Sequence, residues 1–340
     1  MSGPVITEPR DVPSSVIFST GTFDARPPLI RSKHQGLTLR TFRFDPAKPA
    51  RPRAVVLMCH GYASHSMFEW MLPSKPGAPH DTYSGSVIDG LVRAGFSVRA
   101  LDHQSHGQSQ GEPRCYFNQF DDLAAEAAAY AEAEMESDPR LQGLKLFLFG
   151  ESMGGATAIK MALKAPQRYA GLVLYAPMIS LDLVKQQPIF GPIRNCHVEP
   201  LAACISVVAP RLPIAKPALN TLWPLAQLEL DTDPLTYSGD CRARVAYEFK
   251  RVTDDFMLDG GLSELEVPFV TFHAAKDTFT DPKGSEVLVK EAKAKDKTLN
   301  RCGPGLEVDV DIWHALAAEP GREVVFAKAL EWLEARAPKL

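Results

Sequence analysis

The chain has 340 residues and a net charge of −4, with 45% hydrophobic and 23% charged residues. This length and composition are typical of a globular enzyme with one large α/β domain or two small ones. No long run of basic residues is present, which argues against nucleic acid as a partner. No apolar stretch approaches the roughly 20 residues that a membrane-spanning helix needs.

The chain ends and the cysteines predict a cytoplasmic protein. Residues 1–4 lack the basic-then-apolar pattern of a secretory signal. The final tripeptide Pro338-Lys339-Leu340 partly resembles the Ser-Lys-Leu peroxisomal signal, but its proline makes the match poor, so we do not expect peroxisomal targeting. The six cysteines form no Cys-x-x-Cys pair, so we expect reduced thiols rather than disulfides or a zinc site. We expect neither a metal nor a cofactor.

The order of sequence patterns predicts an α/β fold. Residues 1–15 are polar and contain prolines, which predicts a disordered N-terminus, and short alternating segments over residues 16–44 predict an antiparallel hairpin. The predicted strands that follow cover residues 54–59, 96–101, 144–149, 171–175, 268–273 and 308–312, and the predicted helices cover residues 83–94, 120–136, 153–164, 284–293 and 324–335. Continuous apolar strands separated by helices predict a mostly parallel central sheet with helices on both faces.

Two segments interrupt this alternation. Residues 178–249 carry many prolines and large apolar side chains, and we interpret them as a cap inserted over the active site of a core formed by residues 16–177 and 250–340. Residues 67–80 form a second, smaller insertion, whose apolar side chains, Trp70 among them, are expected to be exposed. Ordinary packing of long loops is the alternative for both segments.

A candidate nucleophile lies at the end of one predicted strand. Residues 146–155 read Leu-Phe-Leu-Phe-Gly-Glu-Ser-Met-Gly-Gly, an apolar strand that stops at a Gly-x-Ser-x-Gly turn before a helix. Gly150 and Gly154 allow a sharp turn without side-chain clashes, which would expose Ser152 Oγ. A chance Gly/Ser turn is the alternative, but a strand before the turn and a helix after it are the context of a nucleophile elbow.

The partners of this serine are sought after it in the chain. A serine nucleophile needs a histidine base oriented by a carboxylate, and in this fold the order is serine, acid, histidine. Asp277 and His314 each follow a predicted strand, where α/β sheets place functional residues. Asp281, beside a proline, fits better as a helix N-cap, and Asp311 lies within a predicted strand. His273 precedes the acid, which is the wrong order.

The tetrahedral intermediate of such a reaction also requires hydrogen-bond donors for its oxyanion. The backbone N–H of Met153, directly after the nucleophile, is one candidate. The second is the N–H of Tyr62, which follows a His-Gly pair after the first predicted parallel strand. Glycine in that loop would let the backbone approach the substrate.

Several segments together resemble the monoacylglycerol lipase family of serine α/β hydrolases, including its plant branch of lysophospholipases and caffeoylshikimate esterases. They are Cys-His-Gly-Tyr at 59–62, Asp-His-Gln-Ser-His-Gly-Gln-Ser-Gln-Gly at 102–111, Phe-Gly-Glu-Ser-Met-Gly-Gly at 149–155, Tyr-Ala-Pro-Met at 175–178, Asp-Pro-Leu at 233–235, Val-Pro-Phe at 267–269, Asp-Lys-Thr-Leu at 296–299 and Trp-His-Ala-Leu at 313–316. Glu151 stands where the animal lipases have histidine, which favours the plant branch.

The resemblance implies the α/β-hydrolase fold and a complete site. It implies Ser152 as nucleophile, Asp277 as acid and His314 as base, with Tyr62 and Met153 as oxyanion donors. In the loop at 102–111, the family pattern suggests a structural turn. We therefore expect the two histidines of that loop, His103 and His106, to hydrogen-bond loop backbone rather than to bind a metal.

The leading hypothesis is a serine carboxylester hydrolase that acts on monoacylglycerol or lysophospholipid-type esters through an acyl-enzyme. The alternatives are an esterase for small or aromatic esters, an acyltransferase on the same triad, and a non-catalytic binding protein on a hydrolase scaffold. The apolar cap favours a lipid substrate, and residues 201–210 are a candidate for peripheral membrane contact. Packing of that segment against the rest of the protein is the alternative.

Overall fold

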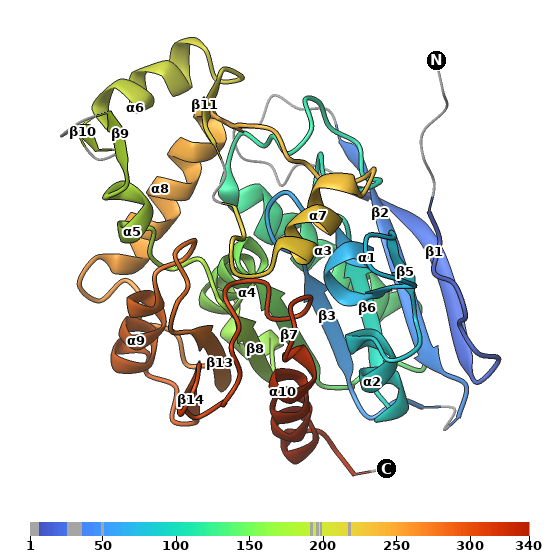
Figure 1. The fold of residues 1–340 in the computed structure, drawn as a ribbon. Coiled ribbons are helices and arrows are strands. Elements are labelled where there is room, and N and C mark those ends of the chain that lie inside the picture. Colours follow the sequence, from blue (N-terminus) through green and yellow to red (C-terminus); the bar gives the residue numbers. More distant parts are fainter. Residues whose placement is uncertain are drawn as a thin grey trace, which may run out of the picture.

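A central sheet organises the protein. The computed structural model describes residues 7–25, 36–48, 51–190, 193–194, 197, 199–216 and 219–339. Its main sheet has eight strands in the order β1-β2-β6-β3-β7-β8-β13-β14 (Figure 1). They are β1 (Val16–Ala25), β2 (Leu37–Pro46), β3 (Val55–Cys59), β6 (Ser97–Leu101), β7 (Leu146–Glu151), β8 (Gly171–Tyr175), β13 (Phe269–Ala274) and β14 (Lys297–Cys302). β1–β2 and β2–β6 pair antiparallel and the other neighbours pair parallel, which confirms the predicted hairpin and mostly parallel sheet.

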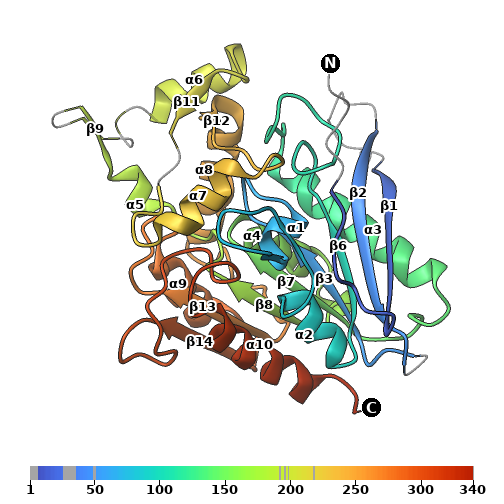
Figure 2. The ribbon, with the colours of Figure 1, turned by 45° about the vertical axis from the view of Figure 1, so that its right-hand side comes forward.

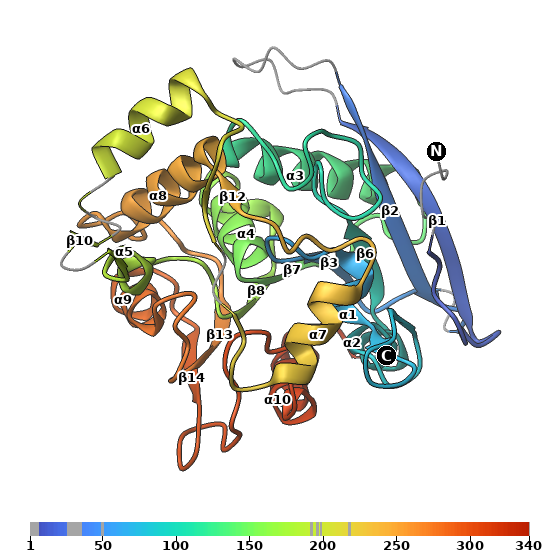
Figure 3. The same cartoon turned by 45° about the horizontal axis from the view of Figure 1, so that its top comes forward.

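Helices cover both faces of this sheet, as predicted (Figure 3). One apolar layer contains side chains from α3 (Phe120–Ser137), α4 (Met153–Lys164) and α9 (Pro282–Glu291), and the opposite layer contains side chains from α2 (Val87–Arg93) and α10 (Arg322–Arg336). Successive residues of one strand point into different layers, as Val56 and Leu57 of β3 do. Because both faces are covered, the central strands form unbroken apolar runs.

One predicted strand is wrong. Residues 308–312 form no strand beyond a single bridge between Val308 and Cys302, and the edge of the sheet is instead β14. The alternating Val-Asp-Val-Asp-Ile pattern arises because Val308 and Ile312 pack into the core from a loop while the two aspartates face solvent. β14 carries the mixed sequence Lys-Thr-Leu-Asn-Arg-Cys, since an edge strand is only partly buried and needs no apolar run.

The N-terminal segment is more structured than predicted. Residues 1–6 lie outside the described residues, as does Leu340 at the other end of the chain. The backbone N–H of Arg10 donates to the carbonyl of Asp81 at 2.7 Å, and the N–H of Tyr83 donates to the carbonyl of Arg10 at 3.2 Å. These bonds attach the chain beside β5 (His80–Thr82), so a disordered N-terminus does not describe residues 10 and 11.

The long segment between β8 and β13 contains several helices and short strands that lie outside the main sheet. These are α5 (Asp182–Lys185), β9 (Pro188–Phe190), β10 (Ile193–Arg194), α6 (Glu199–Val208), β11 (Pro213–Ala215), α7 (Pro224–Thr232), β12 (Cys241–Arg242) and α8 (Ala243–Met257). Figures 1 and 2 show α6 and β11 at the upper end of the molecule. The predicted cap boundary at residue 249 falls inside α8, because that amphipathic helix packs Phe249 and Val252 into the core. Among the described helices, none is both long and apolar enough to cross a bilayer.

The smaller insertion is part of the core rather than exposed. It forms α1 (Ser66–Trp70), β4 (Leu72–Pro73) and the start of β5. Trp70 is completely buried, and its ring centroid lies 5.2 Å from that of Phe149 in β7. The expectation that these apolar residues are exposed is therefore wrong, and long-loop packing, the alternative, describes them.

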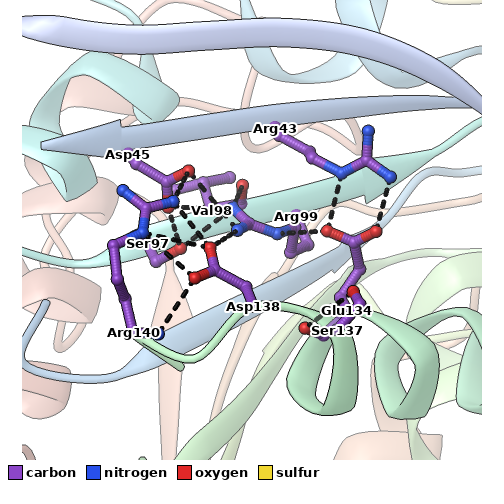
Figure 4. A network of polar contacts seen from close by, with 9 residues as sticks. All are labelled: Arg43, Asp45, Ser97, Val98, Arg99, Glu134, Ser137, Asp138 and Arg140. Atoms are coloured by element: carbon purple, nitrogen blue, oxygen red, sulfur yellow. Dashed lines mark hydrogen bonds and ion pairs between the residues drawn. The ribbon is translucent and has the colours of Figure 1, made fainter. Parts of the chain in front are cut away.

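A buried ion-pair network joins the sheet to α3 (Figure 4). Arg99, in β6, is 1% exposed. Its Nη1 lies 3.0 Å from Asp45 Oδ1 of β2, and its Nε lies 2.8 Å from Glu134 Oε2 of α3. Arg43 and Arg140 contact the same two carboxylates from the rim. A buried charge is tolerated only when it is paired and hydrogen-bonded, and this network satisfies that condition.

Replacing Arg99 by Met should lower the free energy of unfolding by about 3–5 kcal/mol, because two buried carboxylates lose their main partner. Urea unfolding followed by circular dichroism measures this. Arg93→Met is the matched control, since the Arg93 side chain is 74% exposed and should cost less than about 1 kcal/mol. Equal stability of the two variants would contradict the assigned role of the network.

Candidate active site

Ser152 stands in a strained turn between β7 and α4. Its backbone has φ 53° and ψ −116°, in a region that non-glycine residues rarely adopt. Two hydrogen bonds hold it there: Ser152 N–H donates to the carbonyl of Tyr175 at 2.9 Å, and Met178 N–H donates to the carbonyl of Ser152 at 3.0 Å. The end of β8 therefore fixes the conformation of this serine.

The glycines of the turn are required by close backbone contacts. A Cβ atom on Gly150 would lie 2.3 Å from the carbonyl oxygen of Gly154. A Cβ atom on Gly154 would lie 1.9 Å from the carbonyl oxygen of Cys59, at the end of β3. Both distances are impossible for real atoms, so the first turn of α4 can lie this close to the strands only with glycine.

The structure brings Ser152, Asp277 and His314 together. His314 Nε2 lies 3.2 Å from Ser152 Oγ, and His314 Nδ1 lies 2.7 Å from Asp277 Oδ2. The other carboxylate oxygen of Asp277 accepts hydrogen bonds from the N–H groups of Phe279 at 2.7 Å and Thr280 at 3.0 Å. This arrangement keeps the Nδ1 proton of the imidazole on the aspartate side and presents Nε2 to the serine hydroxyl.

Opposite charges set the protonation states of this pair. Burial by itself would raise the pKa of Asp277, but the nearby His314 and His273 outweigh it and lower the pKa well below its usual range. Burial by itself would lower the pKa of His314, but Asp277 outweighs it, with smaller contributions from Glu319 and Glu69, and raises the pKa above 6.5. Asp277 is therefore ionised at neutral pH and stabilises the imidazolium form of His314.

The alternative acids and bases have other roles in the structure. Asp281 caps α9 by accepting from the N–H of Lys283 at 3.0 Å, as predicted. Asp311 is an exposed loop residue paired with Lys276 at 3.1 Å. His273 contacts the acid and not the nucleophile: its Nε2 lies 3.3 Å from Asp277 Oδ2.

The predicted oxyanion donors lie on either side of the serine. Met153 is the first residue of α4, where backbone N–H groups have no partner within the helix. Tyr62 follows Gly61, and a Cβ atom on Gly61 would lie 3.5 Å from Ser152 Cβ, so this loop passes directly beside the nucleophile. The assignment of the two N–H groups as donors stays a prediction.

Three buried histidines lie behind that loop. The rings of His103 and His106 lie 4.6 Å and 5.3 Å from the ring of His60. His106 Nδ1 contacts the carbonyl of Gln104 at 2.9 Å, as predicted, whereas the ring nitrogens of His103 have no hydrogen-bond partner among the described residues. Its backbone N–H donates to His60 Nε2 instead, at 2.9 Å. Within the described part of the chain, no three His, Cys, Asp or Glu residues are arranged to hold a metal ion.

Sequence reasoning missed two buried glutamates that hold the His314 loop. Glu319 accepts hydrogen bonds from the N–H groups of Trp313 at 2.6 Å, His314 at 3.2 Å and Ala315 at 3.1 Å. Glu151 Oε1 accepts from Leu316 N–H at 2.5 Å. A glutamate five residues after the histidine was the available signal for Glu319. For Glu151, the sequence signal is its place beside the nucleophile, which indicates only a branch of the family.

The sequence over residues 77–319 matches the family described as Serine aminopeptidase, S33 (Hydrolase_4). The chain belongs to this family. Human monoglyceride lipase is 28% identical over 302 residues, which cover 87% of this chain and 86% of the relative. Caffeoylshikimate esterase of Arabidopsis thaliana is 26% identical over 292 residues, which cover 84% and 79%.

The solved structure of a monoacylglycerol lipase from Paleococcus ferrophilus superimposes with a TM-score of 0.66 at 24% identity, and covers 88% of this chain and 99% of that one. This likeness shows the fold, which is the α/β-hydrolase fold. With the family match and the curated relatives, it makes the protein a monoacylglycerol lipase-like serine ester hydrolase.

Asp277→Asn should remove the carboxylate that orients the base His314 while the protein still folds. In the native protein, activity needs neutral His314 and should fall as the pH drops through a pKa above 6.5. Without the carboxylate that raises this pKa, the acid limb should move to lower pH, and kcat should fall by about 10⁴-fold. The measurements are kcat and kcat/KM on a nitrophenyl ester between about pH 5 and pH 8. Asp311→Asn is the control and should change neither; an unmoved acid limb in Asp277→Asn would contradict the charge argument.

Proposed function

We propose that this protein hydrolyses a monoacylglycerol-type lipid ester through an acyl-enzyme on Ser152. The observation that carries the proposal is the line of contacts from Ser152 Oγ to His314 Nε2, at 3.2 Å, and from His314 Nδ1 to Asp277 Oδ2, at 2.7 Å. A hydroxyl becomes an effective nucleophile when a base of matched pKa lies within hydrogen-bond reach and is itself oriented by a carboxylate.

The geometry supports the following sequence of steps. Ser152 Oγ attacks the ester carbonyl while His314 Nε2 accepts its proton, and Asp277 stabilises the imidazolium that forms. The N–H groups of Tyr62 and Met153 donate to the oxyanion, each contributing about 3 kcal/mol. His314 then protonates the leaving alcohol. Water, activated by the same histidine, releases the acid and regenerates the serine.

Two observations support a lipid as the substrate. Relatives covering most of the chain are named monoglyceride lipases. Large apolar side chains are exposed on the segment between β8 and β13, among them Leu201, Leu219 and Leu225. We interpret that segment as a cap that binds the acyl chain. The relative named caffeoylshikimate esterase makes an aromatic ester the second candidate.

A substrate panel with Ser152→Ala tests this function. We expect a medium-chain monoacylglycerol to be hydrolysed faster than a lysophospholipid and faster than an aromatic ester, and we expect Ser152→Ala to lose all turnover and all labelling by a fluorophosphonate. Ser263→Ala, which removes a hydroxyl that donates to the Gly260 carbonyl on the surface, should retain both. Higher rates on the aromatic series would replace the lipid proposal, and ester formation with added alcohol would indicate acyl transfer.

We also propose that this enzyme is cytoplasmic and that it contacts membranes through α6. Val207 and Val208 are 71% and 86% exposed, and Leu201 is 60% exposed, on one short helix. Each apolar side chain moved from water into a bilayer contributes about 1.5–3 kcal/mol, so one helix can provide weak, reversible binding.

Val207→Glu with Val208→Glu should therefore reduce co-sedimentation with phosphatidylcholine vesicles at least about tenfold. Turnover of a short, water-soluble ester should stay the same. Ile17→Glu is the control, because Ile17 is equally apolar and 49% exposed but lies on β1. Unchanged co-sedimentation of the double variant would show that α6 does not touch the bilayer.

A further inference from the structure

One segment of the chain contacts both loops that carry the chemistry. We define the α7 strap as residues 219–237, which contain α7 and its flanks. At one end, Asn220 Nδ2 donates to Glu319 Oε1 at 2.7 Å, in the loop of His314. At the other end, Tyr237 N–H donates to the carbonyl of Ala63 at 2.9 Å, in the loop of Tyr62.

Two buried histidine–carboxylate pairs attach the middle of the strap to the smaller insertion and to the residue just before α1. His80 Nε2 lies 3.2 Å from Glu229 Oε2, and His65 Nε2 lies 3.1 Å from Asp233 Oδ1. All four side chains are less than 10% exposed. The strap is therefore held along its length and not only at its ends.

Glu319 is the point where the strap meets the catalytic loop. Its side chain is completely buried, and its two oxygens accept from three consecutive backbone N–H groups, those of Trp313, His314 and Ala315. Asn220 adds a fourth donor. Because the N–H of His314 itself is among these donors, the position of the Glu319 carboxylate fixes the backbone of the base.

Asn220 also holds the start of α7. While its Nδ2 donates to Glu319, its Oδ1 accepts from the N–H of Trp223 at 2.8 Å, just before α7 begins. Its backbone N–H donates to Gln227 Oε1 at 2.7 Å, within α7. Because both hydrogen bonds tie Asn220 to the start of α7, the position of its amide against Glu319 depends on the position of α7.

We propose that Glu319 is a positioning residue for the base His314, and that Asn220 couples this position to the α7 strap. The inference rests on the proposed function of Ser152, His314 and Asp277, and it adds a role for residues outside that triad. The Asn220–Glu319 bond supports the loop that holds His314 within reach of Ser152 Oγ. Loss of this bond removes one support of the base.

The charge of Glu319 affects the pH dependence of reactivity, which a change in packing alone would not alter. Three carboxylates face His314: Asp277 from the loop after β13, Glu319 from its own loop and Glu69 from α1. Each raises the pKa of the imidazole, Asp277 the most. Burial raises the pKa of Glu319 itself, although hydrogen bonds from Trp313, Ala315 and His314 oppose this. Because ionised Glu319 raises the pKa of His314, Glu319→Gln should move the acid limb of reactivity to lower pH, whereas removing the neutral Asn220 amide should leave it in place.

The test uses the rate of fluorophosphonate labelling of the full-length protein as a function of pH. Glu319→Gln should be labelled about 10²-fold more slowly at neutral pH, because a small misplacement of a catalytic group has a cost of this size, and its acid limb should lie at lower pH. Asn220→Ala should be labelled about 3- to 10-fold more slowly with an unmoved limb. Glu323→Gln is the control, because Glu323 is an exposed neighbour paired with Arg322, and it should match the native protein.

The outcomes separate this inference from the proposed function. No labelling of the native protein would overturn the proposed function. Normal labelling of the native protein together with native rates and limbs in Glu319→Gln and Asn220→Ala would overturn only this inference. If circular dichroism shows that Glu319→Gln does not fold, Asn220→Ala and Asn220→Asp decide: Asp, which places a second carboxylate against Glu319, should be slower than Ala, and native rates in both would overturn the inference.

Discussion

The site depends on one strained residue. Ser152 can hold φ 53° only because hydrogen bonds from its N–H and to its carbonyl tie it to the end of β8. Those bonds require β7 and β8 to be neighbours in register, and that register is set by apolar side chains buried on both faces of the sheet. The packing of the core therefore compensates for the strain. It holds the largely buried Ser152 at the C-terminal end of the central strand β7, within reach of His314.

Buried carboxylates organise the loops around that serine. Asp277 is bonded by the N–H groups of Phe279 and Thr280, Glu319 by those around His314, and Glu151 by that of Leu316. A loop lacks the regular backbone hydrogen bonds of a helix or strand. Each carboxylate fixes the shape of its loop by accepting hydrogen bonds from backbone N–H groups. Burial raises the pKa of Glu151, and the neighbouring Glu69 raises it further. These two effects favour the protonated form of the Glu151 carboxyl, next to the nucleophile in the chain.

Much of the fold was predictable because the central strands are buried on both faces. Such strands have unbroken apolar runs, and α4 was predicted with its observed bounds because glycines and a serine mark its start. Prediction failed at the periphery. β14 is an edge strand of mixed polarity, so it lacks an apolar run. Apolar and acidic residues alternate over residues 308–312 because of loop packing, not because they form a strand. Trp70 has the sequence context of an exposed loop, although its ring packs on that of Phe149. In each case a contact distant in sequence outweighed the local pattern.

By itself, the sequence determined which residues could do the chemistry. Gly150, Ser152 and Gly154 are a local motif, and Asp277 and His314 follow from chain order and strand ends, because these features need only neighbouring residues to be recognised. Only the tertiary structure decided what holds those groups in place. Glu319 and Asn220 are 99 residues apart, and their contact exists because the strap folds back over the end of the sheet. Local sequence patterns therefore identify the reacting groups, whereas contacts between distant parts of the chain set the distances between those groups.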